Sequence, residues 1–256
     1  MDKILVYLSL IHEGDWDKIY NDIQNKVAVD KEKMEQVLKT NTDNYITLLS
    51  ANYPIQLKHI FKPPFVLFYK GNIDCLTEKS CKKIAIVGSR ENSEYGKSVT
   101  ESICKTIVNN SSNLIVSGLA KGIDSIAHKT CLENGGKTIA VLGNGLNVIY
   151  PKENIRLYEL IEKEGLLLSE YPSNVMPKKE HFPARNRIIS GICDAVVVTE
   201  AKVKSGTMNT VAHALEDGKQ IFCVPDKINT DSGCNKLIKD GAKLIENGTD
   251  ILEELE

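Results

Sequence analysis

Short apolar runs alternate with helix-length segments from residue 84 onward, and this alternation is what most restricts the possible folds. The runs include Ile84–Val87, Leu114–Val116 and Thr138–Leu142, and a segment with helical character follows each of them. Fully apolar strands separated by helices are typical of a parallel sheet that is covered on both faces. The sequence therefore predicts an α/β domain with a mainly parallel sheet.

The first part of the chain has a different texture. Residues 1 to about 50 are polar and helical in pattern, and two prolines (Pro63 and Pro64) precede a strand candidate at Phe65–Tyr69. We expect a small N-terminal helical region with a linker over residues 1–74 and the main domain over residues 75–256. No apolar run is long enough to span a bilayer, so no membrane partner is expected.

Charge and cysteine content narrow the class of protein further. The chain of 256 residues has a formal net charge of −2, so a nucleic-acid site would have to be a local basic patch. Its seven cysteines are scattered, odd in number and without a CxxC pair. This usage indicates reduced thiols, as in a cytoplasmic protein.

Glycines gather where the expected strands end, which is where open α/β sheets bind ligands. Gly88-Ser89-Arg90 forms the first strand-to-helix turn. Backbone N–H groups at a helix start favour an anion, and an arginine adds a bidentate phosphate donor. The alternative is a tight turn with a surface arginine, and the spacing does not match the GxGxxG dinucleotide motif.

The ends of later strands carry similar candidates for phosphate contacts. Lys121 follows the second strand and Lys152 follows the third, and each is either a phosphate contact or a solvated lysine. After a later strand, a helix start rich in small and hydroxyl residues would also suit an anion; it comprises Ser205, Gly206 and Thr207.

The stretch from His181 to Ala201 is a basic segment that leads into an apolar strand. Arg185-Asn186-Arg187 lies in what we expect to be a loop, and residues 171–190 carry a net charge of +3. Phe182 stands among these cations. Basic side chains beside an aromatic ring are typical of a single-stranded nucleic-acid site. The alternative is a charged loop whose arginines pair with carboxylates of nearby helices.

Signs of catalysis and metal binding are weak. Ser205, His213 and Asp194 could be imagined as a triad, but no GxSxG elbow accompanies them. The five histidines are far apart and no HxxxH or HExxH pattern occurs. We expect no metal, no cofactor and no catalytic residues.

Six motifs in a fixed order resemble the DNA processing protein A (DprA/Smf) family. FPARNRIISG is the most specific of them, and the resemblance covers roughly 200 residues. The motifs are VGSR (87–90), SGLAKGID (117–124), GNGLNVIYP (143–151), SEYP (169–172), FPARNRIISG (182–191) and EAKVKSGT (200–207).

The resemblance implies an extended Rossmann-like domain that binds single-stranded DNA and loads the RecA recombinase onto it, in natural transformation and recombination. Members are not known as enzymes and form homodimers. The implied DNA ligands are Arg90, Lys152, Arg185 and Arg187, with Phe182 stacking on a base. Leu215 and Ile238 are apolar candidates for the dimer interface, and ordinary core positions are the alternative.

Departures from the family pattern and two other possible classes of protein also bear on this prediction. The usual VPG is VPD at residues 224–226. We expect no winged-helix domain after residue 256. A nucleoside-phosphate hydrolase of the lysine-decarboxylase-like type would show PGGxGT where this chain has EAKVKSGT at 200–207. A nicotinamide oxidoreductase would need the missing GxGxxG.

Overall fold

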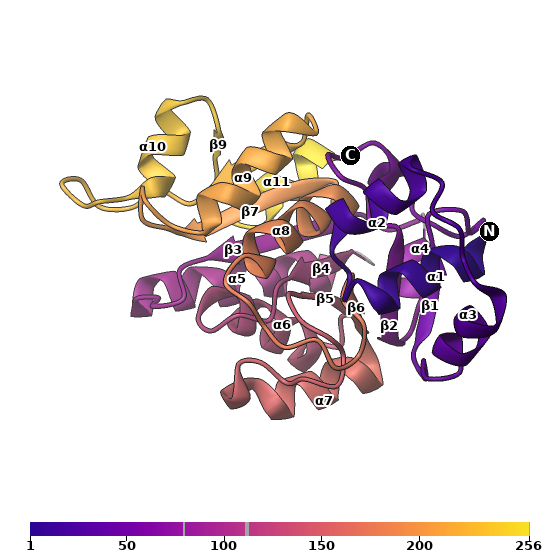
Figure 1. Cartoon of the computed structure of the whole chain (residues 1–256). Helices are drawn as coiled ribbons and strands as arrows, with labels where there is room; N and C mark the ends of the chain where they lie inside the picture. The colour runs from indigo at the N-terminus through magenta and orange to yellow at the C-terminus, as the bar shows by residue number, and fades with distance from the viewer. Residues whose placement is uncertain (79, 111–112, 256) are drawn as a thin grey trace.

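A single twisted sheet organises the chain. The computed structural model describes residues 1–78, 80–110 and 113–255, and within them nine strands follow the order β1-β2-β6-β5-β4-β3-β7-β8-β9 (Figure 1). The strands from β6 to β9 in this order run parallel, whereas β1 and β2 add antiparallel at one edge. The strands are β1 (Asn44–Thr47), β2 (Val66–Gly71), β3 (Lys83–Gly88), β4 (Leu114–Ser117), β5 (Thr138–Leu142), β6 (Leu166–Ser169), β7 (Ala195–Glu200), β8 (Gln220–Cys223) and β9 (Lys243–Leu244).

Helices cover both faces of the sheet, as expected for fully apolar parallel strands. One face carries η1 (Ile55–Lys58), α4 (Asp74–Thr77), α8 (His181–Ile192), α9 (Thr207–Glu216) and α10 (Gly233–Lys239). The other face carries α1 (Asp2–Ile11), α2 (Trp16–Gln24), α3 (Lys31–Leu38), α5 (Glu94–Asn110), α6 (Ile123–Glu133), α7 (Ile155–Glu164) and α11 (Thr249–Leu255).

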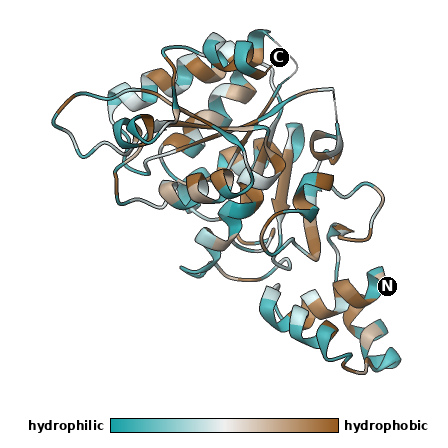
Figure 2. Ribbon diagram, turned by 90° about the horizontal axis from the view of Figure 1, so that it is seen from above, coloured by the Kyte–Doolittle hydropathy of each residue, from teal (hydrophilic) through white to brown (hydrophobic). Residues whose placement is uncertain are grey.

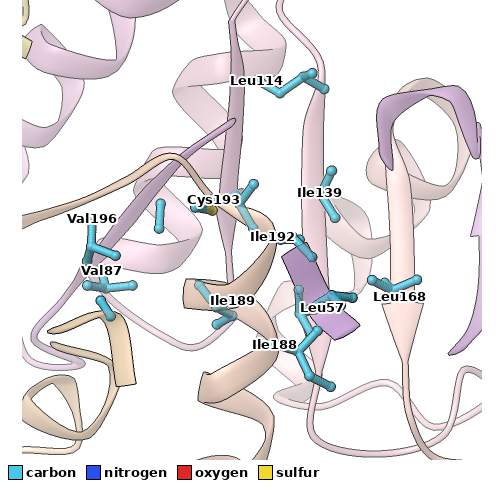
Figure 3. Packing of buried hydrophobic residues seen from close by; sticks show 14 of the residues in the cluster. Leu57, Val87, Leu114, Ile139, Leu168, Ile188, Ile189, Ile192, Cys193 and Val196 are labelled. Carbon is cyan, nitrogen blue, oxygen red and sulfur yellow. The ribbon is translucent and has the colours of Figure 1, made fainter. Parts of the chain in front are cut away.

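The core on the α8 face positions the site. Ile188, Ile189 and Ile192 of α8 pack in one cluster with residues of the strands, and Leu57 of η1 lies beside them (Figure 3). These three isoleucines are at most 2% exposed. Because full burial of an isoleucine side chain contributes about 1.5–3 kcal/mol, α8 is firmly anchored by its apolar side.

The N-terminal helices form a separate group at one end of the molecule (Figure 2). Asp15 and Asp30 cap α2 and α3 by accepting from the backbone N–H groups of Lys18 and Lys33. Leu5 and neighbouring side chains of α1 pack onto the sheet face that α7 also covers.

The predicted fold class is confirmed, and the strands expected between residues 84 and 224 are present. The candidate at Phe65–Tyr69 is strand β2, but β1, β9 and α11 were not predicted. β1 and β2 belong to the same sheet as the later strands, while the division of the chain at residue 74 stays a prediction. The expected loop at Arg185-Asn186-Arg187 is wrong, because these residues lie inside α8.

Candidate nucleic-acid interface

A cavity of about 320 Å³ opens at the carboxyl edge of the sheet, between the ends of β3 and β7 and the first half of α8. This is the place where parallel α/β sheets bind ligands. Most of the residues singled out from the sequence line it: Gly88, Ser89, Arg90, Phe182, Arg185, Asn186, Ser205, Gly206 and Thr207. Lys121, Lys152 and Arg187 do not.

The turn after β3 is held in place by Glu200 at the end of β7. The Ser89 N–H donates to the Glu200 carbonyl oxygen at 2.7 Å, and the Ser93 hydroxyl donates to the Glu200 carboxylate at 2.9 Å. Gly122 packs against this turn with φ +75°, and a Cβ there would lie 2.3 Å from the Ser89 carbonyl oxygen. A glycine is therefore required, and the backbone that carries Arg90 is fixed from two sides.

An exposed arginine and an aromatic ring meet at the rim of the cavity. The Arg90 guanidinium carbon lies 5.5 Å from the centroid of the half-buried Phe182 ring, and the Tyr150 ring lies 5.5 Å away on a tilted plane. Phe182 also packs on Gly143, where a Cβ would meet the ring at 3.0 Å. A second, smaller cavity of about 90 Å³ adjoins this group and is lined by Arg90, Lys121, Tyr150 and Phe182. Tyr150 was missed as a site residue from the sequence, although it precedes Pro151 in the third motif.

Arg185 forms part of the cavity wall but is 3% exposed. Its Nη1 donates to the carbonyl oxygens of Gly118 at 2.8 Å and of Val141, so it joins the ends of β4 and β5. Asp124 supplies a nearby negative charge, and burial lowers the pKa of Arg185 to about 10. Asp124, in the first turn of α6, accepts from the N–H groups of Gly118 and Ala120 in the preceding loop.

Arg187 lies on the other side of α8, away from the cavity. Its Nη2 donates to both carboxylate oxygens of Glu170, at 2.7 and 2.5 Å, and the two side chains are 5% and 6% exposed. Burial raises the pKa of Glu170, and the charge of Arg187 opposes this rise. Arg187 therefore forms a buried structural ion pair. Pairing with a carboxylate was the alternative for this segment, but Arg187 lies in a helix instead of a loop, and Glu170 follows strand β6 instead of lying in a helix.

Lys121 and Lys152 both lie near the smaller cavity and differ in their contacts. Lys121 lines it and forms an ion pair with Glu153 at 2.5 Å. Lys152 is exposed at the start of η2 (Lys152–Asn154), which follows Pro151. Asn154 ties η2 to the loop after β4 by donating to the Leu119 carbonyl oxygen at 3.0 Å.

The start of α9 closes the cavity on its far side. The Thr207 hydroxyl donates to the Gly88 carbonyl oxygen at 3.0 Å, and the Asn186 amide donates to the Gly206 carbonyl oxygen at 3.4 Å. Lys202 is exposed and lines the same cavity, although the sequence did not single it out. Its position two residues after the end of strand β7 is the signal that could have identified it.

Neither a metal centre nor a membrane span is found in the described parts of the chain. No group of three or more histidine, cysteine, aspartate and glutamate side chains there could hold a metal ion. No helix among these residues is long and apolar enough to cross a bilayer. The five histidines include His128, which is buried and shares a hydrogen bond of 2.7 Å with the Thr138 hydroxyl.

Fold and site together define a class: Rossmann-like α/β proteins with a cavity at the carboxyl edge of the sheet, where a cation and an aromatic ring stand side by side. Comparison with known families narrows this class. The model of the DNA recombination-mediator protein A family matches residues 44–256, and the chain belongs to that family. The resemblance seen in the sequence motifs is thereby confirmed.

Individual relatives agree with the family. The DNA processing protein DprA of Streptococcus pneumoniae is 48% identical over 212 residues, which is 82% of this chain and 73% of that protein. The DprA of Bacillus subtilis is 41% identical over 238 residues, 91% of this chain and 79% of that protein.

Two solved structures share the fold. The X-ray structure of the S. pneumoniae protein matches with a TM-score of 0.82 at 42% identity, over 94% of this chain and 81% of that chain. The DprA of Helicobacter pylori, whose structure is described as giving insight into its single-stranded DNA binding mode, matches with a TM-score of 0.75 at 33% identity. That match covers 84% of this chain and 96% of that chain.

Proposed function

We propose that this chain is a recombination mediator that binds single-stranded DNA and loads the RecA recombinase onto it, during DNA uptake, natural transformation and recombination. The observation that carries the DNA-binding part is the exposed Arg90 guanidinium beside the Phe182 ring at the cavity rim. This pair offers a positive charge for a phosphate and an aromatic face for a base, the two features that single-strand sites combine. The relative from H. pylori supports the proposal.

In this proposal the residues divide into contacts and supports. Phosphates would lie against the Gly88-Ser89-Arg90 turn, the Ser205–Thr207 helix start and the lysines at positions 121, 152 and 202. Phe182 would stack on a base. Arg185 and Asn186 would shape the cavity wall, and Arg187 would act through the position of α8 instead of touching DNA.

The test is fluorescence anisotropy with a labelled oligothymidylate about 20 nucleotides long over a range of salt concentrations. Arg90→Ala and Lys152→Ala should each weaken binding several-fold. Each should also make the slope of log affinity against log salt shallower, by up to about 0.7 for each phosphate that the variant no longer neutralises. Lys82→Ala is the matched control, because Lys82 is exposed before β3, at the opposite edge of the sheet.

Two results would count against the proposal. Absence of single-strand binding by the wild-type protein would reject the function. Equal binding by wild type, Arg90→Ala and Lys152→Ala would reject the site while leaving the function open to another surface.

We propose that the chain has no enzymatic activity of its own. The rival reading, a nucleoside-phosphate hydrolase, needs a carboxylate free to act on a sugar. The Glu200 carboxylate in the corresponding motif instead accepts hydrogen bonds from the Ser93 N–H and hydroxyl groups. Release of free base from nucleoside monophosphates incubated with the protein would overturn this view.

The assembly is a further part of the proposal. Leu215 of α9 is 59% exposed, whereas Ile238 of α10 is half-buried against the core. We propose a homodimer through this late part of the domain, in the cytoplasm, and RecA as the partner. Light scattering should report a dimer for wild type and half that mass for Leu215→Arg. An unchanged mass would remove Leu215 from the interface.

A further inference from the structure

One cation of the proposed DNA site forms an ion pair with an acidic side chain. The Lys121 ammonium, which lines the smaller cavity beside Arg90 and Phe182, is 2.5 Å from the Glu153 carboxylate. Glu153 itself lines the neighbouring groove between α6 and α7. Among the cations that line the two site cavities, Lys121 therefore stands out because a rim carboxylate engages its ammonium group.

The backbones on both sides of this pair are firmly placed. Lys121 lies between Leu119, at φ +54°, and Gly122, at φ +75°, in a turn that packs on the β3 turn. Glu153 lies in η2, which Asn154 ties to the carbonyl oxygen of Leu119. The two charged side chains are thus presented to each other by fixed supports, so their meeting does not depend on loop motion.

The Lys121–Glu153 ion pair bears on DNA binding more than on the stability of the fold. Both side chains are more than half exposed, so the ion pair adds little to the stability of the fold. Its carboxylate oxygen instead accepts from one of the three N–H donors of the ammonium group and offsets its positive charge, so it competes with a phosphate oxygen for Lys121. A negative charge at this rim also repels a polyanion directly.

We propose that Glu153 sets the affinity of the site: it pairs with Lys121 in the free protein, and a strand phosphate competes with it for this cation on binding. The inference rests on the proposed single-strand function. It makes Glu153 a residue that lowers the affinity of the site for polyanions, so that Lys121 contributes less to binding than its position suggests.

The test is a double-mutant cycle of Glu153→Gln and Lys121→Gln, read by anisotropy with the same oligothymidylate at about 50 mM salt. Glu153→Gln should bind at least about threefold tighter than wild type, because both the competition and the repulsion are removed. This gain should be about 1.5- to 5-fold larger when Lys121 is present than in the Lys121→Gln background, the range expected for one exposed ion pair.

Glu133→Gln is the matched control. Glu133 is also an exposed glutamate that lines the α6–α7 groove and pairs with a lysine, Lys129, at 3.7 Å. It carries the same charge change without touching a residue of the site, so it should change affinity by less than about 1.5-fold. Thermal melting of each variant confirms that the fold is intact.

The outcomes separate this inference from the function on which it rests. Wild-type protein that does not bind the oligonucleotide rejects the function. Wild type that binds while Glu153→Gln binds no tighter rejects the role of Glu153. An equal gain in both Lys121 backgrounds, or an equal gain in Glu133→Gln, also rejects it, because the effect would then be one of overall charge.

Discussion

Replacing Arg187 by methionine tests whether this arginine supports the fold or binds DNA. In the folded chain it donates to both oxygens of Glu170, and the two side chains are 5% and 6% exposed. Removing one member of a buried ion pair costs about 3–5 kcal/mol, because the other charge is left buried without its partner. Since the total stability of a domain is about 5–15 kcal/mol, Arg187→Met should lower the urea midpoint strongly.

Acidification should restore part of the stability that Arg187→Met loses. Burial already raises the pKa of Glu170, and removing Arg187 takes away the charge that opposes this rise. At pH values between the unfolded-state glutamate pKa of about 4.3 and this raised folded-state pKa, the folded variant holds a proton that the unfolded chain releases. Its stability is present at low pH and lost as pH rises through the raised folded-state pKa. The deficit relative to wild type should therefore be smaller near the unfolded-state pKa of about 4.3 than at about pH 8.

The assay combines urea unfolding, followed by circular dichroism at both pH values, with DNA binding at low temperature. The double variant Glu170→Leu with Arg187→Met should regain much of the lost stability, because it leaves no unpaired buried charge. A stability of Arg187→Met within about 1 kcal/mol of wild type would refute the reasoning. So would a fully folded Arg187→Met protein that no longer binds single-stranded DNA.

Three other perturbations probe the site and its supports. Gly118→Ala would place a Cβ 2.4 Å from the Arg185 guanidinium, so we expect a loss of about 1–3 kcal/mol in unfolding free energy, measurable by urea titration. Phe182→Leu should weaken single-strand binding by about 1–3 kcal/mol in an anisotropy titration, because leucine can neither stack on a base nor hold the Arg90 guanidinium over a ring. Burial lowers the pKa of His128 to about 3. Its contribution to stability is therefore complete above the unfolded-state pKa of about 6.5 and is lost as pH falls below it. Wild type should lose about 2 kcal/mol more than His128→Gln between about pH 7 and pH 5, as followed by urea midpoints.

The main strands could be predicted because their local sequence carries the whole signal. Ile84–Val87 and Ala195–Val198 are short, fully apolar and bounded by turns, and only a strand buried on both faces needs such a run. β1 carries no comparable signal. Asn44–Thr47 is a four-residue edge strand, and it is defined by its pairing with β2, which is far along the chain.

The candidate site was predictable in place but not in detail. The glycines after the strands indicated the correct edge of the sheet, and Arg90 and Phe182 do meet there. The burial of Arg185 and Arg187 could not be read locally, because their counter-charges come from Asp124 and Glu170 on other elements. A basic helix with tertiary partners and a basic exposed loop have the same composition.

The hydrogen bonds from Arg185 to Gly118 and Val141 also limit how the chain around the site can vary in length. One guanidinium joins the carbonyl oxygens of Gly118 and Val141, so an insertion before either position would pull a strand end away from its donor. The segment at 225–231 after β8 carries no such tie to α8 and projects from the body of the molecule (Figure 1). Loop grafts and tags should therefore be accepted there, while insertions at the ends of β4 and β5 that Arg185 joins should not be tolerated.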